Sequence, residues 1–167
     1  MKQRTLFITI FILFVSCGRS HEGFEAPDFT LPDIYGNNIR LYDCLDRGPV
    51  VIIPWALWCK ICIKELDALK PYTDDLHSST GVYFYAISQD KPRAIDQVKP
   101  FAESHEWIPH YLVLLDTANI IRDLYDIQAM PSTISIDQDG KIVFRWQGYH
   151  PGDELLITDS LKALFER

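Results

Sequence analysis

The 167-residue sequence is poor in cysteine, in basic runs and in long hydrophobic segments, and each shortage excludes a class of protein. Four unevenly spaced cysteines are too few for a small domain held together by a disulfide framework. A net charge of -7 without any Lys/Arg run argues against a nucleic-acid partner, because phosphate binding needs a basic patch. The length favours a single domain, and the sequence contains no internal repeat and no low-complexity stretch.

An apolar run lies near the N-terminus, where Leu6–Val15 is apolar except for Thr9. Its ten residues are well short of the roughly 20 that a membrane-spanning helix needs. Lys2 and Arg4 precede the run, and Ser16-Cys17-Gly18 follows it. A basic start, an apolar centre and small residues after it are typical of a secretory signal peptide. We therefore expect the rest of the chain to be exported from the cytoplasm.

The segment Phe14-Val15-Ser16-Cys17 resembles a bacterial lipobox, in which the cysteine becomes the lipidated N-terminus of the mature protein. The lipobox prefers Leu at the position of Phe14, so a signal peptide without lipidation and an uncleaved anchor stay as alternatives. We interpret residues 1–16 as a lipoprotein signal peptide, Cys17 as the lipidation site, residues 17–24 as a tether and residues 25–167 as the domain. The domain would then be lipid-anchored to a bacterial membrane in the cell envelope, on the periplasmic or extracytoplasmic side.

Beyond the tether, periodicity and turn residues predict alternating strands and helices. Residues 24–43 should form an extended segment and a hairpin, because prolines and Gly36-Asn37-Asn38 oppose a helix. The expected strands are 50–53, 82–87, 111–115, 133–136 and 141–146, and the expected helices are 59–76, 94–106, 118–125 and 153–166. Pro54 should end the pairing of its strand, and Pro71 should kink its helix. The helix 153–166 should have an apolar side that contains Leu155, Leu156, Leu161, Leu164 and Phe165. This order indicates a layered α/β domain with helices on both faces of the sheet.

Cys59 and Cys62 stand where a buried strand gives way to a helix. The free N–H groups at a helix start stabilise a thiolate, and the neighbouring Lys60 should lower the pKa of the Cys59 thiol further. The two-residue spacing places Cys62 one turn later on the same face, within reach of a disulfide. The motif therefore predicts a redox pair in which Cys59 attacks a partner and Cys62 resolves the mixed disulfide.

Three other interpretations compete for this motif. A zinc site would need two more ligands, yet Cys17 and Cys44 are isolated and no His lies at a ligand-like spacing from Cys62. A c-type haem site needs His directly after the second cysteine, and that position is Ile63. A permanent structural disulfide stays as an alternative. We expect no metal and no cofactor.

The motifs resemble the thioredoxin superfamily, specifically the membrane-anchored or periplasmic TlpA/ResA-like group, over about residues 25–167. The residues that carry the resemblance are Ala26-Pro27-Asp28-Phe29, Gly36, Trp55-Ala56-Leu57-Trp58-Cys59, Asp116, Tyr125, Met130-Pro131-Ser132-Thr133, Asp137 and Asp139-Gly140. The resemblance implies a thioredoxin-like fold, with a central mixed β-sheet flanked by helices and an N-terminal β-hairpin extension. It also implies a thiol-disulfide oxidoreductase.

The group places a cis-proline opposite its Cys-x-x-Cys motif, and the corresponding position here is Pro131. A cis bond there would expose the backbone of Met130 for strand-like pairing with a substrate peptide. From the residues alone, an ordinary trans proline at the start of an edge strand is the alternative. The resemblance favours the cis form, and with it Met130 and Pro131 as substrate-binding residues.

Glu65 lies three residues after Cys62, on the apolar face of the expected helix. A carboxyl group there should have a raised pKa and could exchange a proton with the resolving thiol, and the related group often has Glu at this position. A surface Glu paired with a lysine is the alternative. Two departures put the redox potential and the direction of electron flow in doubt. Lys60-Ile61 separates the cysteines where many relatives have Pro, and Ile53 replaces the buried Asp of thioredoxins.

The remaining residues of interest are aromatic or isolated. We expect Trp58 to shield Cys59 and offer an apolar docking face, Trp55 to lie in the core, and Cys44 to be a small buried hydrophobe. A third redox thiol at Cys44 is the minority alternative.

We expect disulfide reduction or oxidation on exported proteins, by a monomer that exchanges electrons with a membrane or periplasmic partner. A peroxiredoxin-like peroxidase is the alternative, but its Pro–Thr/Ser–Cys pattern fails because Trp58 and Ile61 occupy the last two positions counted from Pro54. A non-catalytic binding module would be expected to lose the two cysteines.

Overall fold

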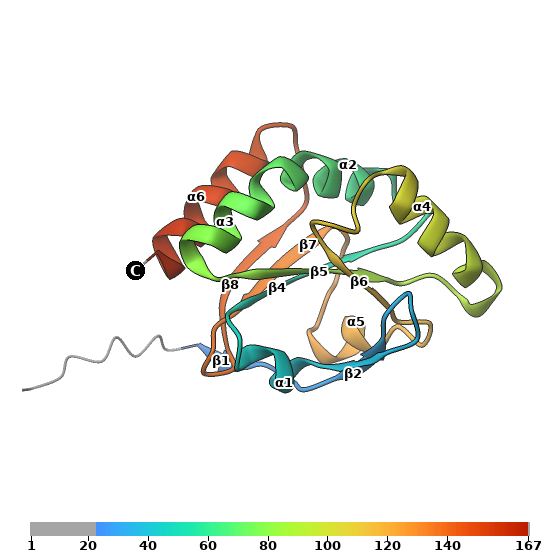
Figure 1. Ribbon diagram of the computed structural model, residues 1–167, viewed down its shortest axis with the longest axis horizontal. Coiled ribbons are helices and arrows are strands. Elements are labelled where there is room, and N and C mark those ends of the chain that lie inside the picture. Colours follow the sequence, from blue (N-terminus) through green and yellow to red (C-terminus); the bar gives the residue numbers. More distant parts are fainter. Residues whose placement is uncertain (1–22, 167) are drawn as a thin grey trace, which may run out of the picture.

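The computed structural model describes residues 23–166, which form a twisted sheet with helices on both faces (Figure 1). The sheet has six strands in the order β1-β8-β7-β4-β5-β6. They are β1 (Phe24–Glu25), β4 (Val50–Trp55), β5 (Tyr83–Ser88), β6 (Leu112–Leu115), β7 (Ser132–Ile136) and β8 (Lys141–Gln147). β4, β5 and β6 are parallel to one another, whereas β7 is antiparallel to β4 and β8 is antiparallel to β7. The sheet is therefore mixed, as expected.

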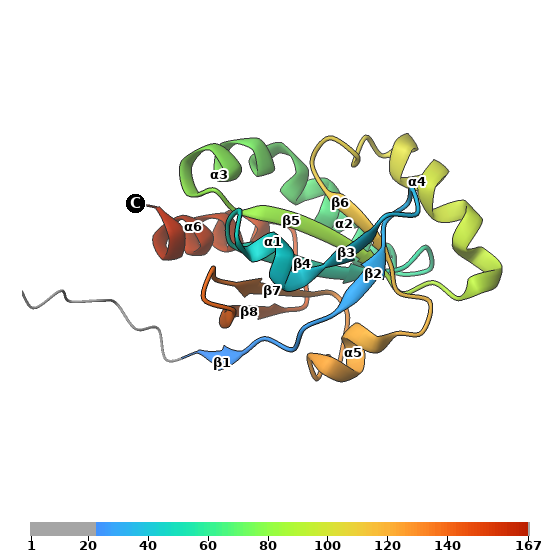
Figure 2. The ribbon, with the colours of Figure 1, turned by 60° about the horizontal axis from the view of Figure 1, so that its bottom comes forward.

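Two layers of helices cover the sheet. One face carries α2 (Lys60–Leu69), α3 (Thr73–Thr80), α4 (Val98–Ser104) and α6 (Asp153–Phe165) (Figure 1). The other carries α1 (Leu41–Leu45), α5 (Ile120–Leu124) and the antiparallel hairpin of β2 (Thr30–Pro32) and β3 (Asn38–Arg40), which Figure 2 brings forward. The expected N-terminal hairpin is confirmed. Within residues 23–166, no helix is long and apolar enough to cross a membrane. The expected signal peptide, Cys17 and most of the tether lie outside the described residues.

β4 runs through the middle of the sheet, and all six of its residues are buried. Because successive strand side chains point to opposite faces, Val51 and Ile53 join the core beneath α2, α3, α4 and α6. Val50 and Ile52 join the core beneath α1, α5 and the hairpin. Each fully buried aliphatic side chain contributes about 1.5–3 kcal/mol, so this strand anchors both cores.

The prediction that Pro54 ends strand pairing is wrong for one neighbour of β4. Pairing with β7 covers only Val50–Ile52, but pairing with β5 continues through Pro54 to Trp55. The backbone groups of alternate residues face alternate sides, and the oxygen of Trp55 accepts a hydrogen bond from the N–H of Gln89, just after β5. The missing N–H of Pro54 therefore faces the β7 side, where the ladder has already ended.

The helices follow the expected order with two adjustments. The expected helix 59–76 is divided at Pro71 into α2, a 3₁₀ turn (η1, Lys70–Tyr72) and α3, and the expected helix 94–106 begins as a 3₁₀ segment (η2, Pro92–Gln97) before α4. The short helix α1 has no counterpart among the expected elements. On α6, Leu155 and Leu156 were expected on the apolar side, but they are 51% and 54% exposed. Ile157 and Leu161 form the buried face instead.

Candidate functional site: the disulfide at the start of α2

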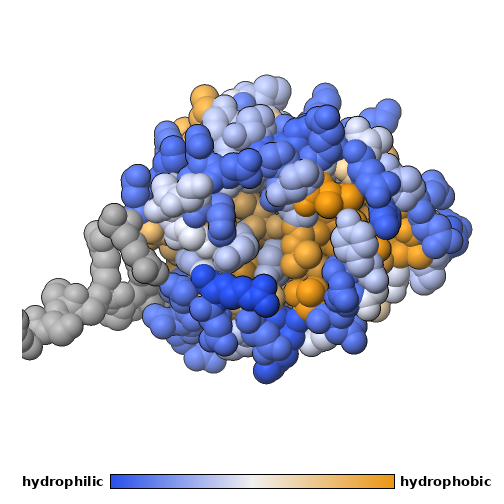
Figure 3. Space-filling view, viewed as in Figure 1, coloured by the Kyte–Doolittle hydropathy of each residue, from blue (hydrophilic) through white to orange (hydrophobic). Residues whose placement is uncertain are grey.

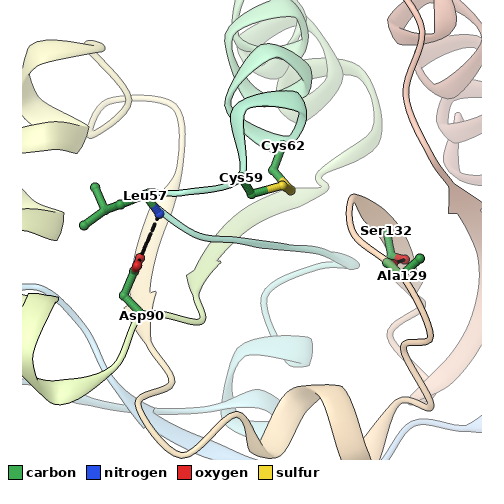
Figure 4. The surroundings of a disulfide bond; sticks show 6 residues. All are labelled: Leu57, Cys59, Cys62, Asp90, Ala129 and Ser132. Atoms are coloured by element: carbon green, nitrogen blue, oxygen red, sulfur yellow. Dashed lines mark hydrogen bonds between the residues drawn. A yellow bond between two sulfur atoms is a disulfide. The ribbon is translucent and has the colours of Figure 1, made fainter.

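A disulfide joins Cys59 and Cys62 where the loop after β4 enters α2 (Figure 4). The S–S bond is 2.00 Å long and the two Cα atoms are 5.4 Å apart. Cys59 is the N-cap residue of α2, and its N–H donates to the oxygen of Ala56 at 2.9 Å. The predicted pairing of the two cysteines is confirmed. Its position also places Cys59 next to the unpaired N–H groups of a helix start, which favour a thiolate.

The two sulfur-bearing residues differ in their access to solvent. Cys59 is 6% exposed, whereas Cys62 is completely buried against the hydrophobic core under α2. Of the two, only Cys59 keeps any surface that a partner molecule could contact. The order of reaction inferred from the sequence, with Cys59 attacking first, stays a prediction.

Asp90 holds the loop that carries the disulfide, and sequence reasoning missed it. Its carboxylate accepts hydrogen bonds from the N–H of Leu57 at 3.0 and 3.3 Å (Figure 4). It also accepts one from the hydroxyl of Ser88 at 3.0 Å. The side chain is 3% exposed, so these bonds satisfy a buried carboxylate. The signal available in the sequence was an Asp two residues after a buried strand, whose partner 33 residues earlier could not be identified.

Glu65 lies buried on α2, one helical turn beyond Cys62. Its Oε1 accepts a hydrogen bond from the hydroxyl of Thr133 on β7 at 2.9 Å, while its Oε2 has no hydrogen-bond partner in the described part of the chain. Burial, aided by the nearby charge of Asp153, raises the pKa of Glu65 to about 7 and outweighs the Thr133 bond, which lowers the pKa. The expected raised pKa is confirmed, and the surface-Glu alternative is excluded.

The chain segment before β7 faces the disulfide from the other side. Figure 4 shows Ala129 and Ser132 on a loop opposite Cys59 and Cys62, and the hydroxyl of Ser132 donates to the oxygen of Ala129 at 2.7 Å. The Met130–Pro131 peptide bond in this loop is cis, as the resemblance implied. The oxygen of Pro131 accepts from the N–H of Gly148 at 2.9 Å, which ties the loop to the end of β8.

The two tryptophans near the disulfide have opposite environments. Trp58 is 69% exposed directly before Cys59, and Ile61 between the cysteines is also exposed. Trp55 is fully buried, with its ring stacked on Phe101 and edge-on to Trp107 at a centroid distance of 4.7 Å. The core position of Trp55 and the exposure of Trp58 agree with expectation, and the role of Trp58 stays a prediction.

Cys44 is buried on α1, in the core on the opposite face of the sheet from Cys62. It lines a cavity of about 390 Å³ together with Arg47, His77, Tyr83 and Leu112, among others. Figure 3 shows apolar surface gathered in a hollow over β5 and β6, surrounded by hydrophilic side chains. No group of three potential metal ligands occurs within residues 23–166. Cys44 therefore packs as a small hydrophobe, apart from the redox pair.

The domain is built on a mixed sheet and carries a Cys-x-x-Cys disulfide at a helix start, opposite a cis-proline loop. These features together define a thioredoxin-like thiol-disulfide oxidoreductase. Residues 23–145 match the AhpC/TSA family. Thiol-disulfide oxidoreductase ResA of Bacillus subtilis (strain 168) is 31% identical over 160 residues, which cover 85% of this chain and 84% of that protein. ResA of a Bacillus cereus strain is 29% identical over 173 residues, covering 93% and 95%. The chain belongs to the AhpC/TSA family of thioredoxin-like proteins and is an oxidoreductase.

Solved structures agree with the fold. A thiol:disulfide interchange protein from Bacteroides sp. superposes with a TM-score of 0.69 at 25% identity, covering 86% of this chain and 89% of that one. Peroxidoxin BcpB from Mycobacterium tuberculosis superposes with a TM-score of 0.72 at 23% identity, covering 85% and 96%. The second likeness concerns the fold alone.

Proposed function

We propose that this protein exchanges disulfides with exported proteins through a mixed disulfide on Cys59. The observation that carries the proposal is the unequal access to the two sulfurs, with Cys59 in part accessible and Cys62 completely buried. An attacking thiol must meet a partner, whereas a resolving thiol needs only to reach its neighbour.

In the reducing direction, the Cys59 thiolate attacks a substrate disulfide, forms a new S–S bond and releases one substrate thiolate, which takes up a proton. Cys62 then attacks Cys59, closes the Cys59–Cys62 disulfide and releases the second substrate thiol. The substrate gains two electrons, and a membrane or periplasmic electron-transfer partner returns two to the pair. The oxidising direction is the same sequence reversed.

Glu65 is proposed as the proton partner of Cys62. Cys62 must lose its proton in a buried setting before it attacks, and the unpartnered Oε2 of Glu65 is a buried acceptor one turn away. A carboxyl group with a pKa of about 7 is divided between its two protonation states near neutral pH, which suits a group that both accepts and returns a proton.

The apolar surface beside Cys59 supports a docking role for Trp58, Met130 and Pro131. Trp58 is exposed directly before Cys59. The segment between Ala129 and Ser132, which contains Met130 and Pro131, lies opposite the disulfide (Figure 4). A substrate chain placed between them would pair with the backbone of Met130 and contact the Trp58 ring. In this proposal the domain is held at the extracytoplasmic side of a membrane by lipid on Cys17.

The test is to trap partners in cells with Cys62→Ser. Without the resolving thiol, the mixed disulfide between Cys59 and its partner should persist. Mixed disulfides should accumulate and should disappear when Cys59→Ser is added. The wild-type soluble domain should reduce insulin disulfides, and failure of both assays would overturn the proposal. Fast peroxide consumption would instead favour the peroxidase alternative. Fatty-acid labelling should be lost in Cys17→Ser, and labelling that survives would contradict the lipid anchor.

A further inference from the structure

We propose that the rim of the disulfide is a docking surface for an acidic partner protein, with an apolar centre at Trp58 and Ile61 and a basic side formed by α2 and η2. This inference rests on the proposed function and names the chemistry of its partner. Four exposed cations, Lys60, Lys64, Lys91 and Arg93, lie in two short segments, although the chain as a whole has a net charge of -7.

The two basic segments are brought together by the fold. The N–H of Leu57 bonds to the carboxylate of Asp90, and the N–H of Gln89 bonds to the oxygen of Trp55. Figure 4 shows Asp90 bound to Leu57 in the loop that carries Cys59, and Lys91 and Arg93 follow Asp90 in the chain. In the sequence the two pairs of cations are about 30 residues apart, and the contacts of Leu57 with Asp90 and of Trp55 with Gln89 bring their segments together.

Acidic side chains cancel only part of this local charge. Within residues 57–64 there is no acidic residue, and within residues 90–97 the two are Asp90, which is buried under its hydrogen bonds, and Asp96, which is exposed. Other acidic groups lie toward the cis-proline loop and the start of α6, at the exposed Asp126 and the half-buried Glu154. The rim is thus basic on the α2 and η2 side of the disulfide, whereas acidic and basic groups are mixed toward the cis-proline loop, where Asp126 and Arg145 line the same pocket.

This division should select and orient partners. A partner whose reactive cysteine lies in an apolar stretch flanked by Asp or Glu gains attraction from α2 and η2, while a basic partner is repelled there. Such attraction acts mainly on the rate of encounter and weakens as salt shortens the screening length to about 8 Å at 0.15 M.

The experiment uses the reduced soluble protein and three disulfides. Two are peptides with the same disulfide-bonded cysteines and apolar residues, one flanked by Asp/Glu and the other by Lys. The third is the small uncharged hydroxyethyl disulfide. We measure the second-order rate constant for oxidation of the reduced protein by each disulfide at low and high salt, in wild type, in Lys91→Glu/Arg93→Glu, and in the charge-matched control Arg47→Glu/Arg122→Glu. Both control residues are exposed. Arg47 follows α1 and Arg122 lies on α5, and both helices cover the other face of the sheet from α2.

At low salt, wild type should favour the acidic peptide by about tenfold or more, and high salt should remove most of that preference. Lys91→Glu/Arg93→Glu should abolish or reverse the preference while the rate with hydroxyethyl disulfide stays the same, and the control should behave as wild type. An equal rate with both peptides, or the same loss in the control, would overturn the acidic-partner inference. A wild-type protein that fails to react with hydroxyethyl disulfide would instead count against the proposed function.

Discussion

The redox pair and Cys44 are buried cysteines of one small domain, yet they stand in opposite environments. Cys59 and Cys62 lie at a helix start, beside a loop held by Asp90 and one turn from the buried carboxyl group of Glu65. Cys44 lies on the other face of the sheet, within the apolar core under α1. The comparison teaches that neighbours, rather than burial itself, decide whether a cysteine is equipped for chemistry.

Removing either cysteine of the pair should produce the largest difference between the two regions. Cys59→Ser or Cys62→Ser should lower insulin reduction by at least about a thousandfold, because each sulfur takes part in every turnover. Cys44→Ser should leave turnover within about twofold, since its sulfur lies on the other face of the sheet. A large loss in Cys44→Ser, measured on protein shown to be folded, would make it a third redox thiol.

Replacing Glu65 should reveal the energetic cost of keeping a carboxyl group beside the pair. Its pKa is about 7 in the folded protein against 4.5 as the ordinary value, so the native state binds the proton more tightly than the unfolded chain. The stability from this protonation is fully present below pH 4.5 and is lost as pH rises through 7.

Relative to wild type, Glu65→Gln should therefore gain stability between pH 4.5 and pH 8, by about 3 kcal/mol. Urea unfolding of the oxidised protein at the two pH values measures this gain. The control Glu103→Gln, at an exposed position on α4, should show almost none. An equal response in both variants would refute the raised pKa.

Breaking the Asp90 contact should loosen the loop that distinguishes the pair from Cys44. Asp90→Ala leaves the N–H of Leu57 without its buried acceptor, so the free energy of unfolding should fall by about 1–3 kcal/mol. Asp43→Ala removes only an ion pair with Arg40 in which the carboxylate is 69% exposed, and should change stability by less than about 1 kcal/mol. Chemical denaturation of both variants checks the difference, and equal losses would mean that Asp90 does not hold the loop.

Shortening Cys44 should have the smallest effect. Cys44→Ala removes one buried sulfur next to a cavity that already exists, so we expect a loss of about 1 kcal/mol and unchanged disulfide exchange. Thermal unfolding and the insulin assay measure the two quantities separately. A loss of several kcal/mol would show that Cys44 supports the core more than its small side chain suggests.

Much of the fold followed from local patterns. The buried strand β4, the helix after Cys59, the interruption at Pro71 and the strands β7 and β8 were all predicted, because propensity and turn chemistry act over a few residues. The prediction at Pro54 was wrong for β5, because the neighbouring strand that the backbone groups of Pro54 face depends on the order of strands in the sheet. Leu155 and Leu156 were misplaced because apolar residues alone do not fix which helix stripe meets the core.

The sequence by itself determined the redox pair, since two residues between cysteines and a helix start bring the sulfurs together through neighbouring backbone alone. Tertiary structure decided what surrounds that pair. Asp90 reaches Leu57 across 33 positions, and Thr133 reaches Glu65 across 68. Such contacts depend on strand order and on helix packing against the sheet. The physical reason is that a pKa or a docking surface arises from burial and charge in three dimensions, which no local pattern specifies.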